Sequence, residues 1–122
     1  CAQFGLPYLK ACRVTPGVDL LKYLRSYATA SGWLLDSHVE EYGGVGARFD
    51  WSLVPAQLER PLVLSGGLAP DNVGAAVRRV RPWAVDVSSG VEAIGRDGKP
   101  VRGSKDPARI VAFIEEVRHA DD

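Results

Sequence analysis

The chain has 122 residues, of which 46% are hydrophobic, so it can bury a core and disorder is not expected. Lys and Arg total 15, as do Asp and Glu, and the formal net charge of zero argues against nucleic acid or an anionic membrane surface as the main partner. No apolar run approaches the length of a membrane span, and we expect a cytoplasmic protein.

The first predicted unit is a strand followed by a helix. The strand covers residues 8–14, and Pro16-Gly17 marks the turn after it. The helix is expected to bury one stripe, made of Leu20, Leu24 and either Tyr27 or Ala28.

The second unit begins with a strand over residues 33–36. A long loop follows, with the glycine-rich segment Gly43-Gly44-Val45-Gly46. Asp50 can cap a short helix that begins at Trp51, because an aspartate side chain accepts hydrogen bonds from the first N–H groups of a helix.

The third unit pairs a strand over residues 61–65 with a helix. Gly66-Gly67 ends the strand, Pro70 suits the first turn of the helix, and Ala69 stands at the cap position, where a polar residue is usual. The predicted buried stripe consists of Val73, Ala76, Val77 and Val80.

The fourth unit has a strand over residues 84–88, followed by Ser89-Gly90. Residues 94–103 come next, and their sequence pattern predicts neither a helix nor a strand. The last helix has Asp106 as its cap and Pro107 in its first turn. Its predicted buried face consists of Ile110, Phe113, Ile114 and Val117.

Four strand–helix units in succession predict an α/β fold with parallel strands and helices outside the sheet. No composition shift marks a boundary, so we expect residues 1–122 to form a single unit. The pattern is compatible with an open doubly wound sheet and with half of a (β/α)8 TIM barrel.

Two glycine-containing turns follow the last two predicted strands, Gly66-Gly67 and Ser88-Ser89-Gly90. Without a Cβ, the backbone can approach a ligand closely and point N–H groups at phosphate oxygens. One glycine pair is ordinary turn chemistry. Two of them, after the last two strands of such a series, match the phosphate site of a barrel.

Two aspartates are candidates for the chemistry. Asp36 ends the second strand beside the glycine-rich loop and is a candidate general acid; Asp86 shares a strand face with Ala84 and Ser88. For both, bracing of a loop is the alternative. The roles of Lys10, Arg13 and His38 stay open, and Cys12 is expected to be a small buried residue. The two cysteines form no metal-ligand spacing, and no metal or cofactor is predicted.

Several motifs together resemble the phosphoribosylanthranilate isomerase family, and the resemblance covers essentially the whole chain. The matching segments are Leu64-Ser65-Gly66-Gly67-Leu68, Val85-Asp86-Val87-Ser88-Ser89-Gly90-Val91-Glu92, Phe49-Asp50-Trp51, Lys105-Asp106-Pro107, and the stretches around Leu6-Pro7 and Leu34-Leu35-Asp36. The departures are Val45 in the glycine-rich loop, Ala69 at the helix cap, and a longer stretch from Ile94 to Gly103.

The resemblance implies the carboxyl-terminal half of a (β/α)8 barrel, strands five to eight. The chain begins at Cys1 and contains no Met, so we expect a piece of a longer protein. The implied reaction is the Amadori rearrangement of N-(5-phosphoribosyl)anthranilate in tryptophan biosynthesis, without a cofactor.

By the same resemblance Asp36 is the general acid and Asp86 lies near the substrate's amino nitrogen. The phosphate-binding residues are Gly66, Gly67, Ser88, Ser89 and Gly90. The family's general base is a cysteine in a segment that this chain lacks, and neither Cys1 nor Cys12 matches its motif. The chain alone is therefore expected to be inactive.

Two alternatives remain at this point. One is a non-catalytic phosphate-binding half-barrel that associates with the missing amino-terminal half or with itself through its open edges. The other is a different phosphosugar barrel enzyme, such as indole-glycerol-phosphate synthase, although the catalytic lysine and glutamate motifs of that family are not apparent.

Overall fold

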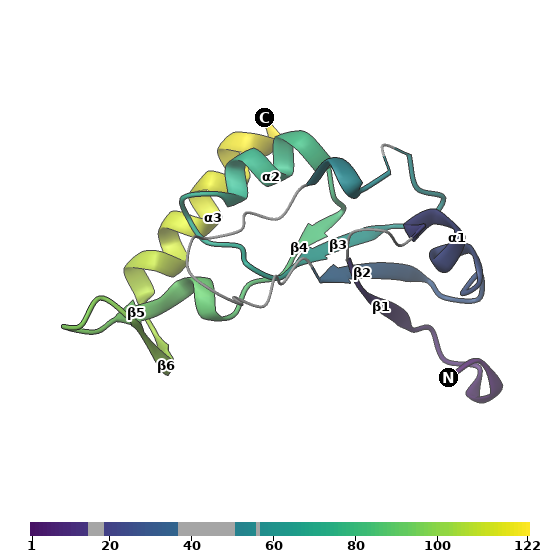
Figure 1. Cartoon of the computed structure of the whole chain (residues 1–122), viewed down its shortest axis with the longest axis horizontal. Coiled ribbons are helices and arrows are strands. Elements are labelled where there is room, and N and C mark those ends of the chain that lie inside the picture. Colours follow the sequence, from purple (N-terminus) through teal and green to yellow (C-terminus); the bar gives the residue numbers. More distant parts are fainter. Residues whose placement is uncertain (15–18, 37–50, 56) are drawn as a thin grey trace.

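The computed structural model describes residues 1–14, 19–36, 51–55 and 57–122 (Figure 1). Its centre is a parallel sheet in the order β1-β2-β3-β4, so each strand pairs with the next one along the chain. The strands are β1 (Leu9–Arg13), β2 (Gly32–Asp36), β3 (Leu62–Ser65) and β4 (Ala84–Val85). This confirms the predicted α/β fold with parallel strands.

Among the described residues there are three α-helices: α1 (Leu20–Arg25), α2 (Val73–Val80) and α3 (Pro107–Asp121). Helices α1 and α2 follow strands of the parallel sheet, as expected for strand–helix units, and α3 follows a later hairpin. Helices α2 and α3 lie side by side above the sheet in the view of Figure 1. Short 3-10 turns occur at η1 (Ala2–Phe4), η2 (Trp51–Leu53) and η3 (Ser89–Val91). No helix among the described residues is long and apolar enough to cross a bilayer.

The hydrophobic core lies between the sheet and the helices. Alternate residues of the strands face it, since successive side chains of a strand point to opposite faces. The core includes Cys12, Trp33, Leu35, Leu62 and Leu64 from the strands, with Leu20, Leu24, Val73, Ala76, Val77 and Phe113 from the helices. The burial of Cys12 confirms its predicted role as a small core residue.

The other face of the sheet carries a second set of residues. Ala11, Leu34, Val63 and Ala84 are neighbours across the four strands. On β1 this face is open, since Ala11 is exposed and 53% of Leu9 is accessible to solvent.

Helix α1 is shorter than predicted, although Leu20 and Leu24 are buried as expected. It ends at Arg25, so Tyr27 and Ala28 lie beyond it. The chain then makes tight turns, in which Tyr27 N–H donates to the Leu24 oxygen and Ala30 N–H to the Tyr27 oxygen. These i to i−3 hydrogen bonds bring the chain back to the start of β2.

Helix α2 begins later than predicted. Its N-cap is Asn72, and the prediction that Ala69 caps the helix with Pro70 in its first turn is wrong. Residues 69–72 form a separate turn, because the Ala69 oxygen accepts from both Asn72 N–H and Val73 N–H.

Helix α3 starts as predicted, with Pro107 in its first turn and the Asp106 side chain accepting a hydrogen bond from Ala108 N–H. Its predicted buried face is wrong in part. Phe113 is buried and Val117 half-buried, but Ile110 and Ile114 are 37% and 44% exposed. These side chains border a groove that nothing among the described residues fills.

The segment after β4 also differs from expectation. The predicted strand over residues 84–88 ends at Val85, because the chain turns into η3 shortly after Asp86 N–H donates to the Leu64 oxygen. A hairpin follows, made of β5 (Glu92–Ile94) and β6 (Pro100–Lys105), which pair antiparallel and account for most of the stretch 94–103.

Other predictions fall on the remaining segments. The helix expected from Trp51 is the 3-10 turn η2. The glycine-rich segment 43–46, His38 and the Asp50 cap lie outside the described residues.

Candidate active site

A row of polar side chains stands at the carboxyl ends of the strands. Arg13 of β1 is the neighbour of Asp36 in β2, and Asp36 is the neighbour of Ser65 in β3. Just after β4, Asp86 continues the row, and its Oδ2 accepts a hydrogen bond of 2.8 Å from Ser65 Oγ. The fold therefore gathers two carboxyl groups and a guanidinium group along one edge of the sheet.

A cavity of about 210 Å³ opens beside this edge. The residues that line it are Asp36, Ser65, Gly66, Gly67, Leu68, Asp86, Val87, Ser88, Ser89 and Gly90. Each residue predicted to bind phosphate or to act as general acid is in this set. Although the sequence separates Asp36 from Gly90 by 54 positions, the parallel topology brings both to one wall.

Ser65, Leu68 and Val87 line the cavity without having been predicted as site residues. For Ser65 a signal existed. It is the last residue of its strand, which puts it at the carboxyl end. It shares a face with Val63, the neighbour of Ala84, so the alternation of side chains puts it on the same face as Asp86.

The loop after β3 owes its shape to its glycines. Gly66 and Gly67 have φ angles of 84° and 66°, a left-handed conformation that residues with a Cβ rarely adopt. Asn72 then braces the loop from the side: its Nδ2 donates to the Gly67 oxygen and its Oδ1 accepts from Ala69 N–H, both at 2.8 Å.

The loop after β4 packs directly onto the first. A Cβ placed on Gly90 would lie 1.7 Å from the Leu68 oxygen, so only glycine fits at this contact. Gly90 lies within the turn η3, whose start faces the cavity. The first N–H groups of a helical turn have no acceptor within that turn and are therefore suited to an anionic ligand.

Three further candidates lie elsewhere or stay open. Lys10 Nζ stands 4.5 Å from the ring centroid of Tyr27 and belongs to the strand face that contains Cys12, away from the cavity. Burial raises the pKa of the Cys12 thiol, against a smaller opposite effect of the Lys10 charge. Arg13 stands in the polar row, but it does not line the cavity.

The model of the family described as N-(5'phosphoribosyl)anthranilate (PRA) isomerase matches residues 2–116. The N-(5'-phosphoribosyl)anthranilate isomerase of Dechloromonas aromatica is 56% identical over 122 residues, which are 100% of this chain and 55% of the relative. That of Leptothrix cholodnii is 55% identical over 121 residues, 99% of this chain and 52% of the relative. The chain thus spans about half the length of the curated relatives it matches.

Solved structures give the same result. The phosphoribosyl anthranilate isomerase of Thermotoga maritima superposes with a TM-score of 0.75 at 41% identity, over 96% of this chain and 54% of that one. An isomerase in complex with reduced 1-(o-carboxyphenylamino)-1-deoxyribulose 5-phosphate superposes with a TM-score of 0.69 at 37% identity, over 96% of this chain and 51% of that one.

Proposed function

The chain belongs to the family of N-(5'-phosphoribosyl)anthranilate isomerases, and from this premise we propose that it supplies the phosphate cradle and the general acid of such an enzyme. The substrate would be N-(5-phosphoribosyl)anthranilate and the product the 1-deoxyribulose phosphate of its Amadori rearrangement. The family match favours this reaction over that of indole-glycerol-phosphate synthase.

One observation carries the proposal: two glycine loops and Asp36 border the same small cavity. A phosphate needs several N–H donors at close range. The loop after β3 offers backbone that no Cβ shields at Gly66 and Gly67, and the turn η3 after β4 offers its first N–H groups. Asp36 lies across the cavity on a neighbouring strand. A ligand held by its phosphate would therefore extend along the row of polar side chains.

In the proposed reaction, the protonated carboxyl group of Asp36 gives its proton to the ribose ring oxygen while the bond from C1 to that oxygen breaks. The nitrogen lone pair forms the protonated imine, and a base then removes the C2 proton to give an enolamine. The enolamine becomes the ketone as C1 gains a proton and the C2 hydroxyl loses one. Asp86, fixed by its hydrogen bond from Ser65, would lie near the amino nitrogen and stabilise positive charge there.

The base is not one of the two cysteines of this chain. Cys12 lies on the opposite strand face from Asp36, in the core, where burial raises its pKa and disfavours the thiolate. Cys1 is an exposed residue before β1. The proposal therefore places the base in another part of the enzyme, and we expect this chain alone to be inactive.

We place the chain as strands five to eight of a (β/α)8 barrel, with a complementary half as its partner. Its outer strands in the described sheet, β1 and β4, each have one edge available for pairing. Beside β4 lies an apolar groove of about 420 Å³, lined by Val85, Val87, Val91, Ile110, Phe113, Ile114, Val117 and Arg118. A further strand and helix, packed after β4, would bury this groove and the exposed face of α3.

The experiment combines this chain with the part of the Dechloromonas aromatica relative that it does not match, by co-expression. We expect no turnover of phosphoribosylanthranilate by the chain alone and turnover by the combination. Robust activity of the chain alone would overturn the assignment of the base to a partner. If the chain sediments as a stable monomer and does not bind the complementary part, the half-barrel proposal is refuted. A homodimer would point to self-association instead.

A further inference from the structure

The hairpin of β5 and β6 follows the loop of residues 88–90 in the chain, and its second strand ends next to that same loop. Glu92 at the start of β5 and Lys105 at the end of β6 are paired residues of the hairpin. Glu92 is buried, with 6% of its surface exposed, which is rare for a carboxylate unless it is paired. The burial is on the Glu92 side of the pair, since 40% of the Lys105 side chain is exposed.

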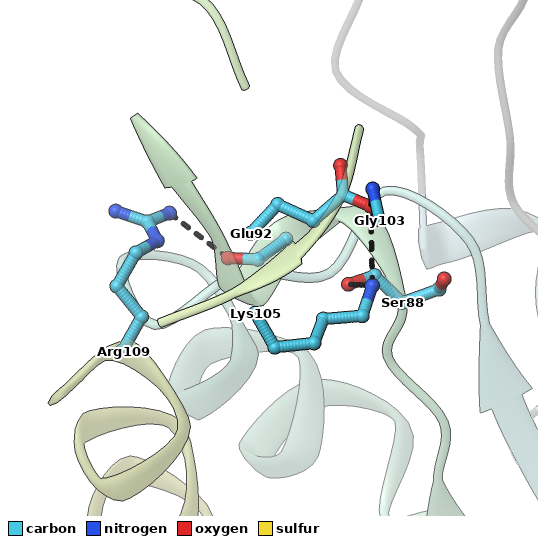
Figure 2. Close-up of polar contacts among 6 residues, drawn as sticks. Ser88, Glu92, Gly103, Lys105 and Arg109 are labelled. Atoms are coloured by element: carbon cyan, nitrogen blue, oxygen red, sulfur yellow. Dashed lines mark hydrogen bonds and ion pairs between the residues drawn. The ribbon is translucent and has the colours of Figure 1, made fainter. Parts of the chain in front are cut away.

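The Glu92 carboxylate fixes β6 at two points. Its Oε1 accepts hydrogen bonds from Gly103 N–H at 2.8 Å and from Lys105 Nζ at 3.2 Å. Figure 2 shows Glu92 between these two residues of β6. The Gly103 N–H, and then the Lys105 ammonium, hold the pKa of Glu92 below its ordinary value, so the carboxylate stays ionised. The ammonium group of Lys105 is therefore paired with an ionised carboxylate.

Lys105 also contacts the loop of residues 88–90. Its Nζ donates to the Ser88 oxygen at 2.8 Å, and Figure 2 shows Lys105 beside Ser88. Arg109 Nη2 donates to the Gly90 oxygen at 2.9 Å. Two cationic side chains thus donate hydrogen bonds to backbone oxygens of the loop of residues 88–90. The Nε of Arg109 is buried and has no hydrogen-bond partner among the described residues.

The hydrogen bond from Lys105 to the Ser88 oxygen fixes the orientation of the peptide group between Ser88 and Ser89. A peptide group is planar and trans, so its C=O and its N–H point in opposite directions. Lys105 holds the Ser88 oxygen on the hairpin side, and the N–H of Ser89 in the same peptide group must then point away from the hairpin. Ser88, Ser89 and Gly90 line the cavity, whereas Glu92, Gly103 and Lys105 of the hairpin are not among its lining residues.

We propose that Lys105, anchored by Glu92, is a positioning residue that orients the backbone N–H of Ser89 toward the substrate phosphate. This rests on the proposed function for the identity of the ligand. Lys105 acts through the Ser88 peptide group, and Glu92 acts through Lys105.

The test measures binding of inorganic phosphate to the full chain by NMR, from the amide signals of Ser89 and Gly90. Lys105→Met removes the hydrogen bond to Ser88, and we expect phosphate to bind about tenfold more weakly, or ~1.4 kcal/mol. Lys105→Arg, which keeps a cationic donor, should restore most of the affinity. Lys99→Met removes the same charge from the exposed end of the same hairpin and should leave binding unchanged.

Two further variants separate positioning from folding. Lys105→Met leaves the buried Glu92 carboxylate without its cation, so it is repeated in a Glu92→Gln background, where no charge is stranded. We expect phosphate to bind as weakly to the double variant as to Lys105→Met. Glu92→Gln alone should weaken binding, and its effect should vanish once Lys105 is absent.

The outcomes are distinct. Normal phosphate binding by the double variant, or weak binding with unchanged Ser89 and Gly90 amide signals in the free protein, would overturn the role of Lys105 and leave the phosphate site intact. A wild-type chain that binds no phosphate would overturn the proposed function, and the role of Lys105 would fall with it.

Discussion

Gly90 and the Leu68 oxygen stand so close that a Cβ on Gly90 would lie 1.7 Å from that oxygen. The loops after β3 and β4, more than 20 residues apart in sequence, therefore meet backbone to backbone. The φ angle of Gly90 is not in the left-handed region, so the requirement for glycine here is one of space and not of backbone strain.

Gly90→Ala should therefore push the two loops apart. We expect it to lower the free energy of unfolding by about 1–3 kcal/mol, as overpacking does, and to weaken phosphate binding. Urea unfolding and an NMR titration measure the two effects. Gly74→Ala is the matched control, because its Cβ would meet only the ends of the Glu116 and Arg78 side chains, and alanine favours the helix. Equal behaviour of the two variants would contradict the close contact.

Asn72 holds the first loop from outside the cavity. Asn72→Ala removes its hydrogen bonds to Gly67 and Ala69, and we expect a loss of about 1–2 kcal/mol in the free energy of unfolding. Phosphate should also bind more weakly, because the loop is no longer braced. Asp71→Ala, at the exposed neighbouring position, serves as the control. If both variants unfold and bind alike, Asn72 does not brace the loop.

Asp36 is expected to serve chemistry more than binding. In the enzyme reconstituted with its complementary half, Asp36→Asn should lower kcat by about 10²–10⁴-fold, since it removes the acid without changing the size of the side chain. The affinity for the reduced product analogue should change little. Asp71→Asn should keep full activity. A loss of affinity that matches the loss of kcat would make Asp36 a binding residue instead.

Glu92 should make the fold sensitive to acid. Its pKa is lowered in the folded chain from an ordinary value of 4.5, chiefly by the Gly103 N–H and then by Lys105. The unfolded chain therefore takes up this proton first, and the stabilisation, which is full above pH 4.5, is lost as the pH falls through the lower folded pKa. Thermal unfolding from pH 6 downward should be less steeply pH-dependent in Glu92→Gln than in wild type. Glu115→Gln, an exposed carboxylate of α3, should follow the wild-type curve.

The position of the cavity could be predicted from the sequence, because it depends on local patterns. A strand with alternating faces fixes where Asp36 and Asp86 point, and a glycine turn after each of two adjacent parallel strands brings Gly66 and Gly90 to the same end. The caps and starts of helices do not follow from local patterns in the same way. Asn72 competes with Ala69 for the start of α2, and hydrogen bonds to the preceding loop decide between them.

The exposure of Ile110 and Ile114 could not be predicted in this way. Their spacing marks one face of a helix, but burial depends on what lies against that face. The hairpin was missed for a related reason. The residues of β6 are all exposed and show no apolar alternation, and the strand is set by its pairing with β5 and by the contacts of Gly103 and Lys105 with Glu92. Such contacts between residues more than ten positions apart leave no local pattern.

The hairpin of β5 and β6 extends away from the rest of the molecule, at the lower left of Figure 1. Its exposed tip, Arg96 to Lys99, is separated from the paired base at Glu92 and Lys105 by the length of the strands. Exposed loop tips tolerate insertions well, because no buried backbone depends on them. A peptide tag or a fluorescent label could therefore be inserted between Asp97 and Gly98 while Glu92 and Lys105 stay paired at the other end of the hairpin. Such a label would stand on the hairpin whose Lys105 contacts the Ser88 oxygen of the loop after β4.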